Sequence, residues 1–184
     1  MPHRIHIFGA SGSGTTTLGA ALARRLAALH LDVDRFYWLP TDPPFTHKRP
    51  PAVRLAMLRH EMAAHNAWVL SGSLCGWGDA LCERFTLAVF LRLDSSLRMA
   101  RLLQREQLRY GDRIAPGGAM YRMHCEFMAW AASYDSAVAP IRSFDLHERW
   151  LAHLCCPVLT LDAQSSVENL VDEIITQSGA RHAG

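Results

Sequence analysis

A glycine-rich stretch near the start of the chain has the residue types and spacing to hold phosphate groups. It reads Gly9-Ala10-Ser11-Gly12-Ser13-Gly14-Thr15-Thr16-Thr17, and its outer glycines match the pattern G-x-x-x-x-G-K-[ST]. Glycines let the backbone aim several N–H groups at phosphate oxygens, and a helix N-terminus adds partial positive charge. Thr16 falls where a hydroxyl ligand to Mg²⁺ belongs. We therefore expect residues 9–17 to bind ATP or a similar nucleotide, with Mg²⁺.

The lysine of that pattern is missing, because Thr15 stands in its place. Such a lysine reaches the β- and γ-phosphates and stabilises charge in the transition state. The loss of one well-placed donor typically costs about 10²–10³ in rate. Two outcomes stay open: another cation substitutes for the lysine, or the site binds nucleotide and turns it over poorly.

Two carboxylates, Asp32 and Asp34, lie at the end of a short stretch, residues 29–33, that reads as a strand. In open α/β folds, ligands bind at the carboxyl ends of the strands, so both side chains are candidates for the site. The alternative for each is a helix cap or a solvated turn.

A row of arginines follows the fourth expected strand. Arg98, Arg101, Arg105 and Arg109 are spaced three, four and four residues apart, which places them on one helical face, and Arg113 follows at the next break. Charge rows of this kind are often solvated surface. Few acidic residues share the stripe, however, so the arginines favour a bound anion.

The elements that must position these residues alternate along the chain. Short apolar runs predict strands, and 3.6-residue periodicity predicts helices between them. The alternation predicts an α/β fold with a five-stranded parallel sheet and helices on both faces. Five prolines make residues 38–51 a long loop. The expected strands are 4–8, 29–33, 68–70, 86–93 and 157–161, and the expected helices end near 28, 65, 110, 138, 154 and 177.

Composition narrows the class of protein further. The chain has 184 residues, a formal net charge of +2 and five cysteines, which suits one α/β domain, taken here as residues 1–178 with a tail at 179–184. The small charge makes nucleic acid an improbable partner. No apolar run is long enough to span a membrane, no secretory signal is evident, and the cysteine pattern favours reduced thiols, so we expect a cytoplasmic protein.

The chain resembles the P-loop kinases of the adenylate-kinase and shikimate-kinase group, and more closely the small bacterial adenylate-kinase-related proteins, some of which are labelled DNA topology modulation proteins. The residues that carry the resemblance are the loop at 9–17, His30–Asp34 with Phe36-Tyr37-Trp38, Trp68–Ser73 and the arginine-bearing helix. One departure is Ser71-Gly72, because the third strand of such proteins often ends in an aspartate before a glycine.

The resemblance implies a three-layer α/β/α fold with a helical lid at about 105–120, and roles for particular residues. Asp32 would orient the Mg²⁺ shell, and Asp34 would bind the acceptor and take a proton from its hydroxyl. Gly72 and Ser73 would line the acceptor site. The lid arginines that would close over the phosphates are Arg101, Arg105, Arg109 and Arg113.

Two hypotheses of different class follow. The first is a kinase that transfers the γ-phosphoryl group of Mg-ATP to a nucleoside monophosphate or another small hydroxyl compound. The second is a nucleotide-binding sensor or regulator with weak or no phosphotransferase activity. The aspartate pair and the arginine row favour the enzyme, whereas Thr15 and Ser71 favour the sensor. The sequence makes no prediction of the acceptor, of the base preference or of the oligomeric state.

Overall fold

The computed structural model describes residues 2–180 and builds them around one parallel sheet. The strand order is β2-β3-β1-β4-β5, so the first strand lies in the middle. This sheet confirms the predicted fold class. The strands are β1 (Arg4–Gly9), β2 (Leu29–Asp32), β3 (Trp68–Ser71), β4 (Leu87–Arg92) and β5 (Val158–Asp162).

Helices cover both faces of the sheet, because its central strands are apolar on both sides. On β1, Ile5 and Ile7 join a core with α1 (Thr15–Arg25) and α7 (Val167–Ala180). Phe8, on the other face of the same strand, packs in a second core. That core takes side chains from α3 (Pro51–Ala64), α6 (Phe144–Leu151) and the 3-10 helix η1 (Asp79–Arg84).

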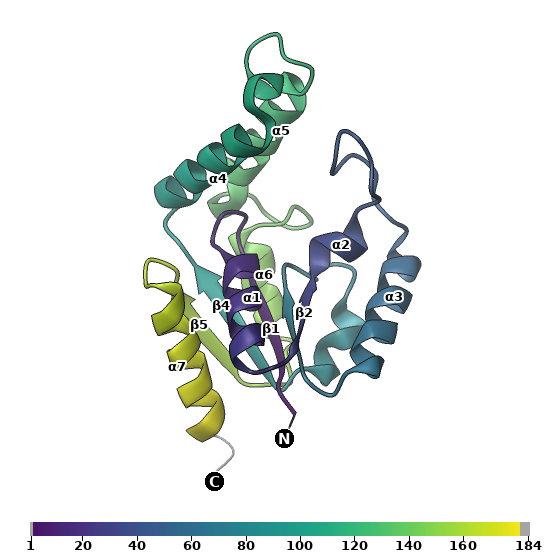
Figure 1. The fold of residues 1–184 in the computed structure, drawn as a ribbon, viewed down its shortest axis with the longest axis vertical. Helices are drawn as coiled ribbons and strands as arrows, with labels where there is room; N and C mark the ends of the chain where they lie inside the picture. Colours follow the sequence, from purple (N-terminus) through teal and green to yellow (C-terminus); the bar gives the residue numbers. More distant parts are fainter. Residues whose placement is uncertain (1, 181–184) are drawn as a thin grey trace.

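Two arms rise beyond the carboxyl ends of the strands (Figure 1). One arm consists of α4 (Ser95–Tyr110), the 3-10 helix η2 (Gly111–Ile114) and α5 (Tyr121–Ala132). The other is the proline-rich loop between α2 (Val33–Tyr37) and α3. Figure 1 shows the loop after β1 lying between the two arms. Residues of this loop and of both arms line one cavity.

Several boundaries differ from the sequence predictions. The second strand ends at Asp32, and α2 begins at Val33, because one oxygen of Asp32 accepts the Asp34 N–H and caps a single helical turn. A turn of five residues carries no periodic signal, and neither α2 nor η1 was predicted. The helix expected to run to residue 138 ends at Ala132, where the 3-10 turn η3 (Ser133–Asp135) follows.

At the other end, α7 continues to Ala180, past the expected tail boundary, and residues 181–184 lie outside the described part. All five cysteines are free thiols, in agreement with the prediction. Within residues 2–180, no helix has both the length and the apolar character needed to cross a membrane.

Candidate functional site

The glycine-rich loop joins β1 to α1 in a tight turn that only glycine allows at two positions. Gly12 and Gly14 have φ values of +84° and +97°, a region that side chains disfavour. A Cβ on Gly12 would also lie 2.8 Å from the carbonyl oxygen of Arg98 on α4. The Ser13 N–H and hydroxyl both donate to the Ala10 carbonyl, at 3.1 and 2.8 Å. These contacts fix the loop in a compact form.

The N-terminus of α1 faces the same space. The helix begins at Thr15 after Gly14, no side chain caps it, and its first turn holds no acidic residue. Its first N–H groups therefore lack an intrahelical partner and carry partial positive charge, an arrangement that binds anions. All nine predicted loop residues, Gly9 to Thr17, line one cavity.

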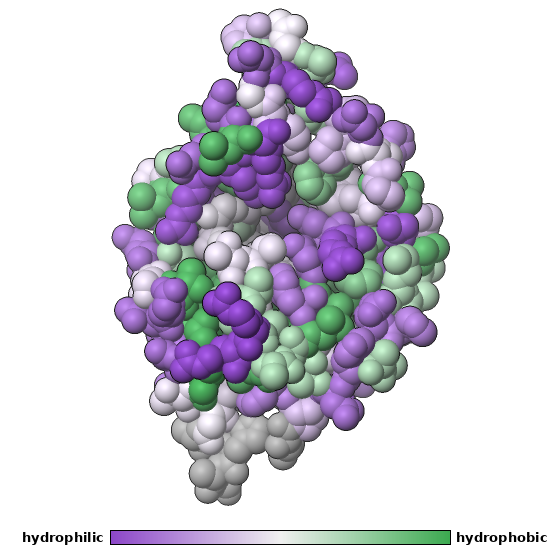
Figure 2. All heavy atoms as spheres, in the orientation of Figure 1, coloured by the Kyte–Doolittle hydropathy of each residue, from purple (hydrophilic) through white to green (hydrophobic). Residues whose placement is uncertain are grey.

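The cavity has a volume of about 1840 Å³. Sites for a single small molecule usually measure about 300–1,000 Å³, so this one has room for a nucleotide and a second ligand. Figure 2 shows the surface hollowed beneath the α4–α5 arm, with mostly pale to hydrophilic residues around the hollow.

Asp32 and Asp34 line this cavity opposite the loop. Asp32 serves as the cap of α2 with one oxygen, so the helix-cap interpretation holds for it, and its second oxygen remains for other ligands. Asp34 is exposed to solvent within the cavity. Desolvation by the surrounding protein and then the charge of Asp32 raise its pKa, while Arg142, Trp38 and Arg105 act in the opposite sense. A raised pKa suits a group that must accept a proton.

The donor set suits Mg²⁺ bound together with a nucleotide. Thr16, Asp32 and Asp34 line the same cavity and offer only hard oxygen atoms. Mg²⁺ keeps several waters and takes one or two carboxylates besides phosphate oxygens. Across residues 2–180, no group of three histidine, cysteine or acidic side chains is arranged to hold a metal by itself.

The end of β3 offers hydroxyls in place of a carboxylate. Ser71 is fully buried, and its hydroxyl lies 2.9 Å from Nε2 of His30. Gly72 and Ser73, which we expected at the acceptor site, line the cavity. The Ser73 hydroxyl is 3.0 Å from Nε2 of His147, whose Nδ1 lies 2.7 Å from the hydroxyl of Tyr134. This buried network fixes the Ser73 side chain.

The arginines of the row do not all face the cavity, and Arg98 is buried away from it. Arg98 is 1% exposed, pairs with Asp135 and donates to the Ala131 carbonyl at 3.3 Å. It therefore joins α4 to the end of α5 and presents no charge to the cleft. The expected bound anion is therefore wrong for Arg98, because its carboxylate partner comes from η3, outside the stripe.

The candidate lid arginines also have different surroundings. Arg101, Arg105 and Arg109 line the cavity. Arg101 donates to the Ala163 carbonyl at 3.2 Å, and Arg105 pairs with Glu106 at 3.2 Å. Arg113 does not line the cavity, and its guanidinium pairs with Asp42 of the proline-rich loop at 3.2 Å. This ion pair connects the two arms.

Sequence reasoning missed Arg142. Its Nη2 donates to the Ser11 hydroxyl at 2.6 Å, across 131 residues of sequence. The guanidinium also lies over the ring of Trp130, 4.5 Å from the centroid. Arg142 belongs to no periodic pattern, so nothing in the sequence singles it out. Trp130 on α5 lines the cavity too.

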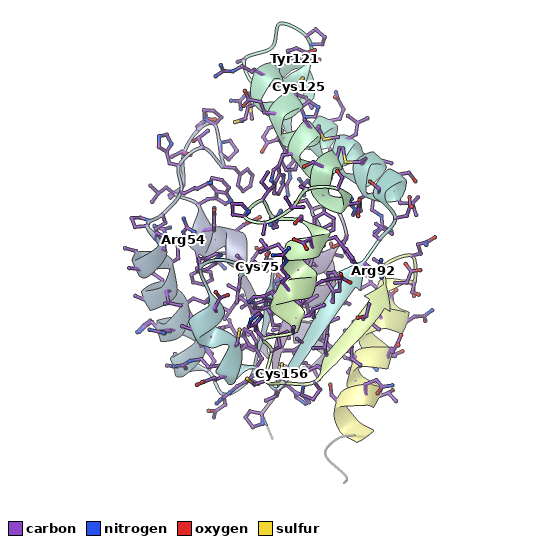
Figure 3. All side chains as sticks on the ribbon, turned by 180° about the vertical axis from the view of Figure 1, so that it is seen from behind. Arg54, Cys75, Arg92, Tyr121, Cys125 and Cys156 are labelled. Carbon is purple, nitrogen blue, oxygen red and sulfur yellow. The ribbon has the colours of Figure 1, made fainter. Side chains whose placement is uncertain are left out.

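Aromatic side chains form the wall below the proline-rich loop. Ring centroids of neighbours are 6.0 Å apart for Trp77 and Tyr37, 4.9 Å for Tyr37 and Trp38, and 5.9 Å for Trp38 and Phe45. Arg54 lies on Tyr37, 3.7 Å from the ring centroid, and Figure 3 shows it on the α3 side of the molecule. This wall offers apolar contacts and cationic groups next to Asp34.

Comparisons with known proteins agree with this arrangement. A family model described as an AAA domain matches residues 5–127. The chain belongs to this family. An uncharacterized protein of Bacillus subtilis, YqaC, is 45% identical over 175 residues, which cover 95% of this chain and 97% of that protein.

Solved kinases share the fold of this family member at low sequence identity. Shikimate kinase from Bacteroides thetaiotaomicron is 20% identical with a TM-score of 0.56, covering 94% of this chain and 96% of its own. A gluconokinase from Sinorhizobium meliloti is 18% identical with a TM-score of 0.54, covering 97% and 93%. The fold is therefore that of the P-loop kinases.

Proposed function

We propose that this chain is a small-molecule kinase that acts in the cytoplasm. It binds Mg-ATP at residues 9–17 and transfers the γ-phosphoryl group to a small acceptor in the adjoining half of the cleft. One observation carries the proposal: the loop and Asp34 line a single cavity with room for two ligands. Within the P-loop kinases, the His30–Asp34 stretch supports a place beside the adenylate-kinase-related proteins.

The roles of the residues follow from their positions. Backbone N–H groups of the loop and of the first turn of α1 hold phosphate oxygens. Thr16 and Asp32 orient Mg²⁺, which neutralises phosphate charge when bound. Arg101, Arg105 and Arg109 add positive charge from α4, and the segment at about 105–120, with Arg113, acts as a lid. Gly72 and Ser73 support the acceptor.

The transfer itself needs one proton acceptor. The acceptor's hydroxyl oxygen forms a bond to the γ-phosphorus, and the bond from that phosphorus to the β–γ bridging oxygen breaks, so that ADP leaves. The Asp34 carboxylate accepts the hydroxyl proton. Most of the rate enhancement comes from positioning and charge neutralisation.

A second candidate is a nucleotide-responsive regulator with little turnover. Two observations favour it: Thr15 stands where the lysine would be, and Ser71 occupies the end of β3 with its hydroxyl next to His30. In this alternative the cleft binds nucleotide and changes shape, and no phosphoryl group moves.

The deciding experiment measures ATP consumption with Mg²⁺ across a panel of nucleoside monophosphates and small hydroxyl compounds. The same samples are titrated with ATP by calorimetry. The kinase predicts turnover that depends on an acceptor and falls about 10²–10⁴-fold in Asp34→Asn. The control is Glu173→Gln, at an exposed position on α7. Tight ATP binding without turnover for any acceptor would leave the regulator as the function.

A further inference from the structure

The missing lysine leaves open which cation reaches the phosphate-binding loop. Among the arginines of α4, Arg101 comes closest, with Nη1 4.0 Å from the position of a Cβ on Gly14. Its other terminal nitrogen donates to the carbonyl of Ala163, the residue after β5. Arg101 therefore lies beside the Gly14 end of the loop, where α1 begins.

Arg142 reaches the opposite part of the loop. Its Nη2 lies 2.6 Å from the Ser11 hydroxyl, and its charge opposes the rise in the pKa of Asp34. Ser11, Asp34 and Arg142 line the same cavity. In the proposed reaction the phosphoryl group crosses this cavity, from the nucleotide on the loop to a hydroxyl beside Asp34.

The guanidinium also lacks a full set of partners. Its Nε is shielded from solvent and makes no hydrogen bond, and within residues 2–180 no ion pair involves this side chain. Burial lowers the pKa of Arg142, while the charge of Asp34 and nearby groups acts in the opposite sense. A half-buried cation that forms no ion pair favours a bound anion.

Trp130 gives the side chain a fixed direction. The guanidinium lies 4.5 Å from the centroid of that ring, and the planar group then needs little reordering when a ligand binds. An arginine fork in this setting suits phosphate oxygens better than a solvated lysine would.

We propose that Arg142 supplies the positive charge that a lysine at position 15 would otherwise provide, by binding the terminal phosphate of ATP. The inference rests on the proposed function, since it takes residues 9–17 to be the nucleotide site. No proton moves at Arg142; it stabilises charge on the non-bridging oxygens of the transferred group, and Asp34 accepts the hydroxyl proton.

The test compares the affinities for ATP and ADP, which differ by the terminal phosphate. Calorimetry is run on the wild-type chain, on Arg142→Met, which keeps most of the side-chain volume, and on Arg149→Met as a control. Arg149 is exposed on α6 and pairs with Asp145. Arg142→Met should weaken ATP binding about 10- to 100-fold and leave ADP within about threefold; the control should change neither.

A second pair of variants separates lysine replacement from a general loss of binding. Thr15→Lys in the Arg142→Met background should restore the preference for ATP over ADP and most of the turnover. Thr15→Lys alone should raise the preference for ATP over ADP and the turnover by less than about threefold, because Arg142 already provides a cation for the terminal phosphate. This single variant leaves Arg142 intact, so it tests the inference even if Arg142→Met does not fold.

Each outcome has a distinct meaning. If the wild-type chain binds neither nucleotide, the proposed function fails and this inference fails with it. If it binds ATP but Arg142→Met keeps the wild-type ATP-to-ADP ratio, only the role of Arg142 is overturned. A rise above about tenfold in the ATP preference or the turnover from Thr15→Lys alone would also overturn this role, since the wild-type site would then have lacked a cation at the terminal phosphate. If Arg101→Met loses the preference for ATP over ADP and Arg142→Met keeps it, the cation is Arg101 of α4 and the role of Arg142 is overturned.

Discussion

His6 and His147 are neutral in the folded chain at pH 7. We therefore predict that the folded state becomes less stable as the pH is lowered. His6 is fully buried on β1 and stacks on Phe85, with ring centroids 4.9 Å apart. Its ring nitrogens make no hydrogen bond of ordinary geometry to the described residues. His147 is fully buried on α6. Burial lowers the pKa of each ring from 6.5 to about 3.

The direction and size of the effect follow from proton binding. Between pH 6.5 and about 3, an unfolded chain binds protons that these two folded rings do not take up, so acidification destabilises the fold. From pH 7 to pH 5, each ring costs about 2 kcal/mol, and the two together about 4 kcal/mol. This is a large part of the about 5–15 kcal/mol that stabilises a typical domain.

Urea unfolding at pH 7 and pH 5 measures this loss directly. His6→Leu should reduce the difference in unfolding free energy between the two pH values by about 2 kcal/mol. The control is His60→Gln, an exposed position on α3, which should keep the full wild-type difference. If His6→Leu showed the same pH dependence as the wild type, His6 would not be held neutral by burial, and the reasoning would be wrong.

Three further predictions concern the cleft. Gly12→Ala should destabilise the chain by about 1–3 kcal/mol and weaken ATP binding, because the new methyl group meets the Arg98 carbonyl at a positive φ; urea unfolding and calorimetry measure the two effects. The acid limb of kcat/KM should lie above pH 3.8, since the Asp34 pKa is raised and the carboxylate must be deprotonated to accept a proton; a limb at or below that value would contradict the assignment. Arg113→Ala should change the unfolding free energy by less than about 1 kcal/mol, as its pair with Asp42 is exposed, yet raise protease cleavage in residues 38–50 if the pair holds the two arms together.

Much of the fold could be predicted because it depends on local pattern. The five apolar runs became the five strands, and the glycine spacing predicted the turn between β1 and α1. Hydrophobic period and turn chemistry act over a few residues, so they can be recognised without a structure. The one-turn helix α2 could not be recognised, since it owes its start to a single cap at Asp32.

The candidate site was predictable only where its residues follow strands. Gly9 to Thr17 and the pair Asp32 and Asp34 come at strand ends, and parallel strands bring their carboxyl ends to one edge. The arginines of α4 share a face by spacing, but spacing alone does not say what each one contacts. Arg98 became a buried link to Asp135 because α5 folds back against α4.

By itself, the sequence determined the α/β class, the glycine-rich loop between β1 and α1, and the threonine at position 15. Only the tertiary structure decided that Arg142 contacts Ser11, that Trp130 lies beneath it, and that Asp34 shares the same cavity with a raised pKa. Contacts between residues 131 positions apart depend on how whole elements pack. Burial, which sets the charge of each group, exists only once the chain has folded.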